Sequence, residues 1–139
     1  YPAVEVSITA PDTLLMIPMD IILIEQVLIN LMENAVQHGK TTTRIELRLS
    51  SAGGLAVFEV ADNGCGIEKE LLPHLFEGYL TRDQEEISDQ RRNMGIGLSV
   101  CMSIVQAHGG TMRAENRKKG GALLQFSLPL EENRHEHQR

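Results

Sequence analysis

The sequence of 139 residues has no tryptophan, two cysteines and only 4% aromatic residues. Cys65 and Cys101 lack the C-x-x-C spacing of zinc sites, which indicates free thiols in a reducing compartment. No apolar run reaches the length of a membrane span, because even residues 14–32 are interrupted by proline and charged residues. The shortage of aromatic residues predicts a core built from aliphatic side chains.

Positive charge is also scarce, with 13 basic against 19 acidic residues and a net charge of −6. The basic residues occur singly or in two short runs, "QRR" and "NRKKG", which are typical of solvated loops. We therefore expect no nucleic-acid partner and no direct membrane contact, since phosphates require a basic face. The chain opens at Tyr1 without a signal peptide, so we expect it to be a piece of a longer protein.

Two periodicities alternate along the chain, one with two residues per repeat for strands and one with 3.6 for helices. The predicted strands are 4–9, 14–18, 43–50, 55–62, 111–116 and 121–130, and the predicted helices are 20–38, 69–76 and 97–108. We expect strands 4–9 and 14–18 to form a hairpin, and residues 77–95 to form a long charged surface loop.

This order of elements predicts an α+β fold. We expect a two-layer α/β sandwich, whose mixed but mostly antiparallel sheet carries about three helices on one face. Residues 1–130 are predicted to form one domain, and residues 131–139 a polar, frayed tail.

The first predicted helix begins after Asp20, a suitable N-cap, and stops at Gly39. Its apolar side, expected to pack on the sheet, comprises Leu28, Leu31, Met32, Ala35 and Val36. Its opposite stripe comprises Gln26, Asn30, Glu33, Asn34, Gln37 and His38. A solvated polar face is the simple interpretation. However, asparagine is a poor helix former, and two asparagines one turn apart suit a Mg²⁺ ion already held by phosphates.

Two glycine-containing segments offer further candidate sites. In "VADNGCGIE", Asp62 can accept a hydrogen bond from an exocyclic amine, while Gly64 and Gly66 allow a flat ring to approach the backbone. The same residues are also typical of a plain hairpin turn. In "NMGIGLSV", Gly95 and Gly97 stand just before a predicted helix, where free N–H groups favour a phosphate.

In this order, the three segments resemble the N, G1 and G2 boxes of the Bergerat ATP-binding fold, shared by histidine kinases, gyrase, Hsp90 and MutL. "LFEGY" resembles its F box, and the resemblance runs from Leu14 to Pro129. It implies ATP and Mg²⁺ as cofactors, with Asn34 as the metal ligand and Asp62 as the reader of adenine. The residues implied to bind ATP are Asn30, Asn34, Gln37, His38, Asp62, Gly64, Gly66, Ile67, Tyr79, Arg82, Arg92, Gly95, Ile96, Gly97 and Leu98, with Arg91 as an alternative phosphate contact.

The residue at position 30 distinguishes between the members of this fold. Gyrase, Hsp90, MutL and the anti-sigma serine kinases have a glutamate one turn before the metal asparagine, and Asn30 provides no such general base for water. The chain therefore resembles the catalytic domain of a sensor histidine kinase, most closely the KdpD group. The alternatives are an ATPase or an anti-sigma-type serine kinase of the same fold, or an interaction module that has lost the nucleotide.

The resemblance also implies partners. None of the five histidines lies in an acceptor context, so the phosphoacceptor is expected on a separate dimerisation domain of the parent kinase. A response regulator, KdpE-like if the KdpD resemblance holds, is expected to receive the phosphoryl group. The domain is expected to be cytoplasmic and its parent anchored in the bacterial inner membrane. The chain departs from the family pattern at four positions: Gln37, His38, Tyr79 and Asn93.

Overall fold

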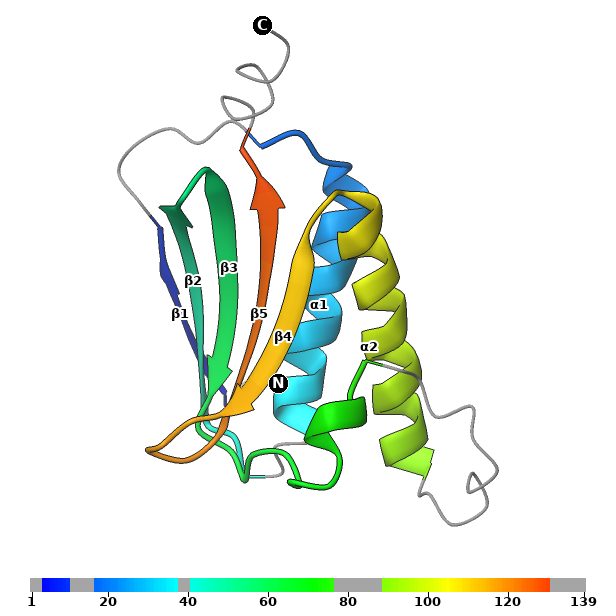
Figure 1. Cartoon of the computed structure of the whole chain (residues 1–139). Helices are drawn as coiled ribbons and strands as arrows, with labels where there is room; N and C mark the ends of the chain where they lie inside the picture. Colours follow the sequence, from blue (N-terminus) through cyan, green and yellow to red (C-terminus); the bar gives the residue numbers. More distant parts are fainter. Residues whose placement is uncertain (1–3, 11–16, 38–40, 77–88, 131–139) are drawn as a thin grey trace, which may run out of the picture.

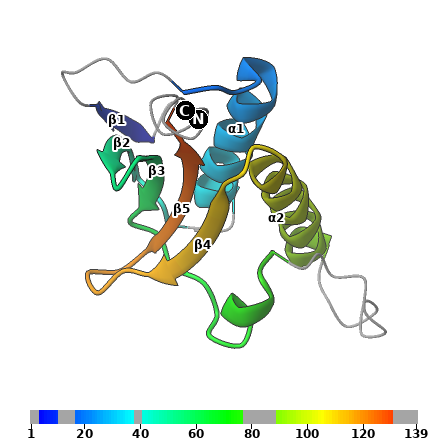
Figure 2. The same ribbon diagram turned by 45° about the horizontal axis from the view of Figure 1, so that its top comes forward.

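A mixed five-stranded sheet carries two α-helices on one face (Figures 1 and 2). The computed structural model describes residues 4–10, 17–37, 41–76 and 89–130, with the backbone alone for 89–96. Its strands are β1 (Glu5–Thr9), β2 (Arg44–Ala52), β3 (Leu55–Asp62), β4 (Thr111–Asn116) and β5 (Ala122–Pro129). Its helices are α1 (Ile21–Gln37), α2 (Asp89–Ala107) and the 3₁₀ turn η1 (Leu72–His74). The predicted two-layer α+β class is confirmed.

The strand order is β1-β2-β3-β5-β4. The two predicted antiparallel hairpins, β2–β3 and β4–β5, are confirmed, and β3 pairs antiparallel with β5 between them. The predicted hairpin of β1 with residues 14–18 is wrong in its described part, because residues 17 and 18 form no strand; residues 14–16 lie outside the described chain. Instead β1 pairs parallel with β2, and α1 lies in the crossover that a parallel pair requires.

The described residues form two α-helices rather than the three predicted. Residues 69–76 contain only the single turn η1, with N–H bonds from His74 to Leu71 and from Leu75 to Leu72. Pro73 explains the difference, since it lacks the N–H that an α-helix would bond to the carbonyl of Lys69.

α1 begins as its sequence predicts. The Oδ1 atom of Asp20 accepts hydrogen bonds from the N–H groups of Ile22 and Leu23, at 3.1 and 3.2 Å. The helix ends at Gln37, and the predicted stop at Gly39 lies outside the described residues. Its fully buried stripe is Ile24, Val27, Leu31 and Ala35. The predicted apolar face was therefore rotated by part of a turn, since Leu28, Met32 and Val36 are only half-buried.

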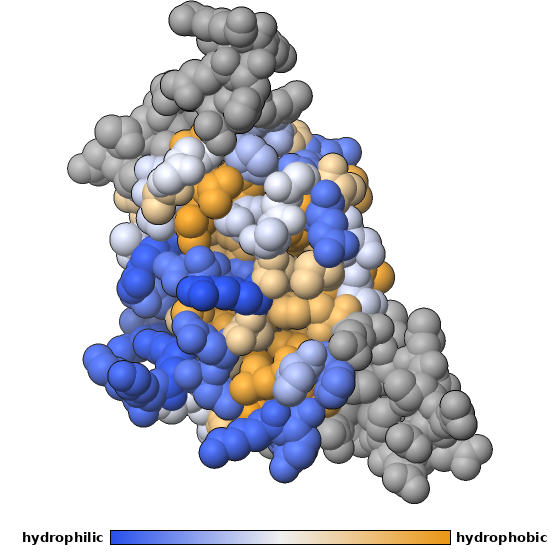
Figure 3. Space-filling view, in the orientation of Figure 1, coloured by the Kyte–Doolittle hydropathy of each residue, from blue (hydrophilic) through white to orange (hydrophobic). Residues whose placement is uncertain are grey.

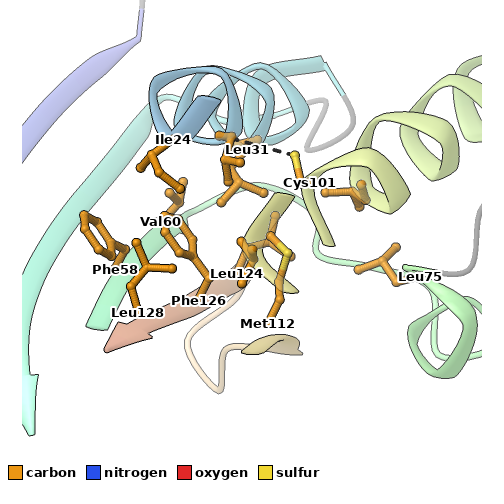
Figure 4. Packing of buried hydrophobic residues seen from close by; sticks show 14 of the residues in the cluster. Ile24, Leu31, Phe58, Val60, Leu75, Cys101, Met112, Leu124, Phe126 and Leu128 are labelled. Atoms are coloured by element: carbon orange, nitrogen blue, oxygen red, sulfur yellow. Dashed lines mark hydrogen bonds between the residues drawn. The ribbon is translucent and has the colours of Figure 1, made fainter. Parts of the chain in front are cut away.

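The core lies between the helices and the sheet (Figure 4). Phe58 of β3 and Phe126 of β5 are register partners whose rings stack with centroids 4.6 Å apart. Aliphatic residues fill the rest of the core, as the scarcity of aromatic residues predicts. In Figure 3 hydrophilic surface dominates over the strands, while hydrophobic surface gathers between β4 and α2.

α2 begins at Asp89, eight residues before Gly97, so the predicted helix start is wrong. Arginine, glutamine and methionine in residues 89–96 favour a helix, and their propensity outweighs the two glycines that suggested a turn. The predicted loop is thus helical from Asp89, and residues 77–88 lie outside the described chain. Among the described residues no helix is long and apolar enough to span a membrane.

Candidate active site

Most of the predicted site elements lie at one end of the molecule. Figure 1 shows the C-terminal end of α1, the segment after β3, η1 and the β4–β5 turn together at the lower end of the view. The first turns of α2 are at the same end. Residues distant in the sequence, from Asn30 to Gly121, are therefore available to a single site.

Asn30 is fixed against α2. Its Nδ2 atom donates to Sγ of Cys101 at 3.5 Å, and its Oδ1 atom accepts from Nε2 of Gln26 at 3.4 Å. The Cys101 thiol is fully buried and also contacts the carbonyl of Val27 at 4.0 Å (Figure 4). Burial raises the pKa of Cys101, although the hydrogen bond from Asn30 opposes this rise. Asn30 therefore supports the helix pair and offers no carboxylate to activate water.

Asn34 has unused hydrogen-bonding capacity. Its Nδ2 atom is enclosed, and it finds no hydrogen-bond partner among the described residues. An enclosed amide without a partner costs roughly 1–3 kcal/mol. Such a group fits a site whose hydrogen-bonding partners arrive with a ligand. The amide oxygen of asparagine is also a type of ligand that coordinates Mg²⁺.

Asp62 is buried at the end of β3, with 5% of its surface exposed. Its Oδ1 atom accepts from the N–H groups of Gly64 at 2.8 Å and Ala122 at 3.2 Å. Both bonds use Oδ1, and no donor among the described residues occupies Oδ2. Burial raises the pKa of Asp62, while those two hydrogen bonds and the Arg117 charge lower it.

Three hydrogen bonds of residues 42–44 connect the surroundings of Asn34 and Asp62. Thr42 donates from its hydroxyl to the carbonyl of Ala35 at 2.6 Å, beside Asn34. The Oδ1 atom of Asn63, beside Asp62, accepts from the N–H groups of Thr43 and Arg44, each at 3.0 Å. Residues 42–44 therefore link the chain neighbours of the two candidate residues.

The segment after Asp62 is held by the β4–β5 hairpin. Asn116 accepts from the N–H of Ile67 at 2.7 Å and donates to the carbonyl of Ile67 at 2.8 Å. Gly66 has a φ of +82°, and a Cβ there would lie 2.8 Å from Oδ1 of Asn116. The backbone conformation therefore favours glycine at position 66, and a side chain there would displace the Asn116 amide.

The predicted phosphate-binding turn is wrong in form for this structure. Residues 95–98 lie inside α2, where their N–H groups belong to a helix rather than to an open turn. The side chain of Leu98 is buried in the core, so any contact with a ligand would come from its backbone. A Cβ at Gly97 would meet no atom within 4 Å, and therefore the helix itself does not require glycine there.

The remaining predicted residues are less fully described. Gln37 is exposed at the end of α1, and Gly64 follows Asp62 directly. His38, Tyr79 and Arg82 lie outside the described residues. For Arg91, Arg92, Gly95 and Ile96 only the helical backbone is described.

Sequence reasoning missed several supporting residues. Cys101, Asn116, Arg117 and Thr42 gave no signal, because their contacts join elements that are far apart in the chain. Asn63 was visible as a turn residue, but its bonds to residues 43 and 44 could not be deduced from it.

No group of three or more His, Cys, Asp or Glu side chains in the described residues could hold a metal ion. A divalent ion at Asn34 would therefore need ligands from outside this set, and phosphate oxygens are the natural ones.

The sheet with helices on one face, the buried carboxylate at a strand end and the paired asparagines define an ATP-binding domain of the Bergerat class. The family described as "Histidine kinase-, DNA gyrase B-, and HSP90-like ATPase" matches residues 19–132. The chain belongs to this family.

Sensor protein KdpD of Clostridium acetobutylicum is 40% identical to this chain over 127 residues. The match covers 91% of this chain and 14% of that protein, so the chain spans about a seventh of its length. This similarity supports the KdpD type and confirms the predicted sensor-kinase relationship.

Solved structures of histidine kinase domains have the same fold as this chain. The ATP-binding domain of PrrB from Mycobacterium tuberculosis matches with a TM-score of 0.73 and 28% identity, over 94% of this chain and 82% of that one. Histidine kinase ThkA in complex with response regulator protein TrrA matches with a TM-score of 0.69 and 26% identity, over 91% of this chain and 34% of that one. The chain is thus similar to histidine kinase catalytic domains in both sequence and fold.

Proposed function

We propose that this domain binds ATP with Mg²⁺ and presents the γ-phosphate to a histidine on a separate dimerisation domain of its parent kinase. The observation that carries the proposal is the pairing of two uncommitted polar groups at one end of the fold. Among the described residues, no hydrogen bond reaches Oδ2 of Asp62, and Nδ2 of Asn34 has no partner. Family membership gives these groups their roles.

Adenine recognition falls to Asp62. Its carboxylate has one oxygen occupied by two backbone N–H groups, which orient the other. An ionised carboxylate accepts a hydrogen bond from the exocyclic amine of adenine. Guanine has a carbonyl at the same ring position, and this second acceptor would face the carboxylate without a hydrogen between them. Gly64, Gly66 and Ile67 would contact the base through the backbone of the same segment.

The residues fit a Mg²⁺ ion brought in by the nucleotide. Asn34 would supply one neutral oxygen ligand and the phosphates most of the rest, and the ion would neutralise phosphate charge during transfer. Gln37 and His38 would lie close to Asn34 along the chain. Arg82, Arg91 or Arg92 would contact the phosphates, together with the first turns of α2, which contain Gly95 to Leu98.

The absence of a general base at position 30 determines whether the bound ATP is hydrolysed. Asn30 replaces a carboxylate and is engaged by both Gln26 and Cys101. Water is therefore not activated from this position, and the nucleotide persists until a histidine nucleophile arrives. This feature disfavours an ATPase and an anti-sigma-type serine kinase.

The partners follow from the relatives. ThkA is known in complex with the response regulator TrrA, and by analogy a response regulator would receive the phosphoryl group here. The similarity to KdpD favours a KdpE-like regulator and a parent anchored in the bacterial inner membrane, with this domain on the cytoplasmic side. Residues 1–130 would form the domain, with 131–139 as a tail.

Calorimetry with ATP and Mg²⁺ tests the binding step. The wild-type domain should bind, and Asp62→Asn should bind at least about 10-fold more weakly, since an amide in place of the carboxylate can turn a donor toward the amine. Equal affinities would reduce Asp62 to a turn residue. Absence of binding in both proteins would favour the nucleotide-free interaction module.

A further inference from the structure

The segment Asp62–Ile67 has little support of its own. The pairing of β3 with β5 stops at Ala61, and the pairing with β2 stops at Asp62. Within the segment, the N–H of Gly64 donates to the Asp62 side chain and the Cys65 thiol donates to the carbonyl of Gly66, while Asn63 bonds outward to residues 43 and 44. Its shape must therefore be imposed by neighbouring elements.

The β4–β5 hairpin supplies that support at both ends of the segment. At the first end, Arg117 donates from Nη1 to the carbonyl of Asp62 at 2.7 Å, and the N–H of Ala122 donates to its carboxylate. At the other end, the amide of Asn116 pairs with both the N–H and the carbonyl of Ile67. The hairpin turn is closed by the bond from Arg117 N–H to the carbonyl of Gly121, at 2.8 Å.

Close packing makes this arrangement specific. A Cβ at Gly121 would lie 2.0 Å from the carbonyl oxygen of Asp62, so the two backbones touch. A Cβ at Gly66 would lie 2.8 Å from the side-chain oxygen of Asn116. The segment therefore cannot shift toward the hairpin, and the side chains of Asn116 and Arg117 prevent it from moving away.

We infer that Asn116 and Arg117 are positioning residues that hold Asp62 and Ile67 in place and thereby set the preference for adenine over other bases. The inference rests on the proposed function, because it assumes that this segment reads the base. Neither residue needs to touch the nucleotide. Asn116 is suited to its place because only a side-chain amide donates and accepts in the geometry of a peptide group.

The base preference is the property to measure, because loss of folding alone would not change it. Inosine triphosphate carries the same phosphates as ATP but has a carbonyl in place of the exocyclic amine. The ratio of the two dissociation constants with Mg²⁺ therefore reports how well Asp62 is placed, independently of the phosphate contacts.

Asn116→Asp and Asn116→Ala are the test variants, and Lys119→Ala, an exposed position in the same turn, is the matched control. Asn116→Asp keeps the size and the acceptor but loses the donor to the Ile67 carbonyl. Calorimetry should give a wild-type preference for ATP of at least about 10-fold. Both Asn116 variants should weaken ATP binding roughly 3- to 10-fold and leave inosine triphosphate nearly unchanged, while Lys119→Ala alters neither.

The outcomes separate the two claims. If the wild type prefers ATP and the Asn116 variants keep the full ratio, the positioning role is wrong and the proposed function stands. If the variants lose both nucleotides equally together with thermal stability, Asn116 is only a structural residue and the inference is again overturned. A wild-type domain that binds neither nucleotide would overturn both.

Discussion

Asn30 on α1 donates a hydrogen bond to Sγ of Cys101 on α2, at 3.5 Å, and so joins the two helices that cover the sheet. Asparagine is a poor helix former, yet the half-buried amide of Asn30 bonds to a buried thiol on the neighbouring helix. The bond explains why α1 tolerates an asparagine one turn before Asn34. Because the residue is asparagine, the position has no carboxylate to activate water. The proposed persistence of bound ATP depends on this absence.

The two thiols should differ sharply in reactivity. Cys65 is exposed, whereas Cys101 is buried and its pKa is raised, so that little thiolate forms near neutral pH. A thiol reagent at neutral pH should label Cys65 in the native protein and Cys101 only after unfolding. Mass spectrometry of the labelled peptides would show this, with Cys65→Ser as the control. Equal labelling rates in the native protein would contradict the described packing of α1 on α2.

Acidification should weaken ATP binding through Asp62. Burial raises the pKa of Asp62, and protonation adds a donor where the amine of adenine needs an acceptor. ATP affinity should therefore fall as the pH drops through the raised pKa, and Asp62→Asn should lack this component. Calorimetry of both proteins across the acid range measures the difference. Parallel pH profiles would show that the carboxylate does not read the base.

The raised pKa of Asp62 has the opposite effect on the stability of the unliganded domain, which should fall as the pH rises. The folded state holds the Asp62 proton at pH values where the unfolded chain has lost it. The contribution of Asp62 to the free energy of unfolding is therefore fully present below the unfolded pKa and lost as the pH rises through the folded one. Thermal unfolding of the wild type relative to Asp62→Asn should show this decline, and a rise would contradict the assignment.

Gly97→Ala should stabilise the free domain and impair the site. Glycine costs a helix about 1 kcal/mol relative to alanine, and a Cβ at Gly97 meets no atom within 4 Å. The melting temperature should rise by a few degrees. If residues 95–98 close on phosphates, the added Cβ and the stiffer helix should weaken ATP binding. Stabilisation with unchanged affinity would remove Gly97 from the site, and Ser103→Ala, farther along α2, serves as a control for a helix substitution.

Asn34→Ala should likewise separate stability from function. The enclosed amide nitrogen has no partner among the described residues, so its removal relieves a cost of roughly 1–3 kcal/mol and the free domain should be no less stable than the wild type. Loss of the proposed ligand should abolish the effect of Mg²⁺ on ATP affinity. Calorimetry with and without Mg²⁺, beside thermal unfolding, measures both. A strongly destabilised variant would indicate a structural role for Asn34 instead.

The regular parts of the fold were predictable because local patterns specify them. Alternation gave β2, β3, β4 and β5 nearly to the residue, and the Asp20 cap gave the start of α1. The partner of β1 was not predictable, since a parallel pairing across α1 leaves no turn signal in the sequence. The start of α2 was missed because two glycines outweighed, in the sequence, a helix propensity that prevails in the structure.

The candidate site was predictable only in its most distinctive residues. Asn34 and Asp62 stand in motifs with recognisable spacing, and the structure finds both with unused polar groups. The distant supports of Asp62 come from Arg117 and Ala122, which lie 55 and 60 positions away, and no local pattern reveals such contacts. Long-range hydrogen bonds of this kind require the fold.

Phosphoryl transfer to a histidine is the most direct measurement of the central claim. The domain is mixed with radiolabelled ATP, Mg²⁺ and the dimerisation segment of its parent, and the labelled bands are treated with acid and with base. The account predicts a label on the dimerisation segment that is acid-labile and base-stable, as a phosphoramidate is, and that is absent with Asn34→Ala. It also predicts negligible phosphate release by the domain alone. Rapid phosphate release by the isolated domain, or an acid-stable label on a serine, would contradict it.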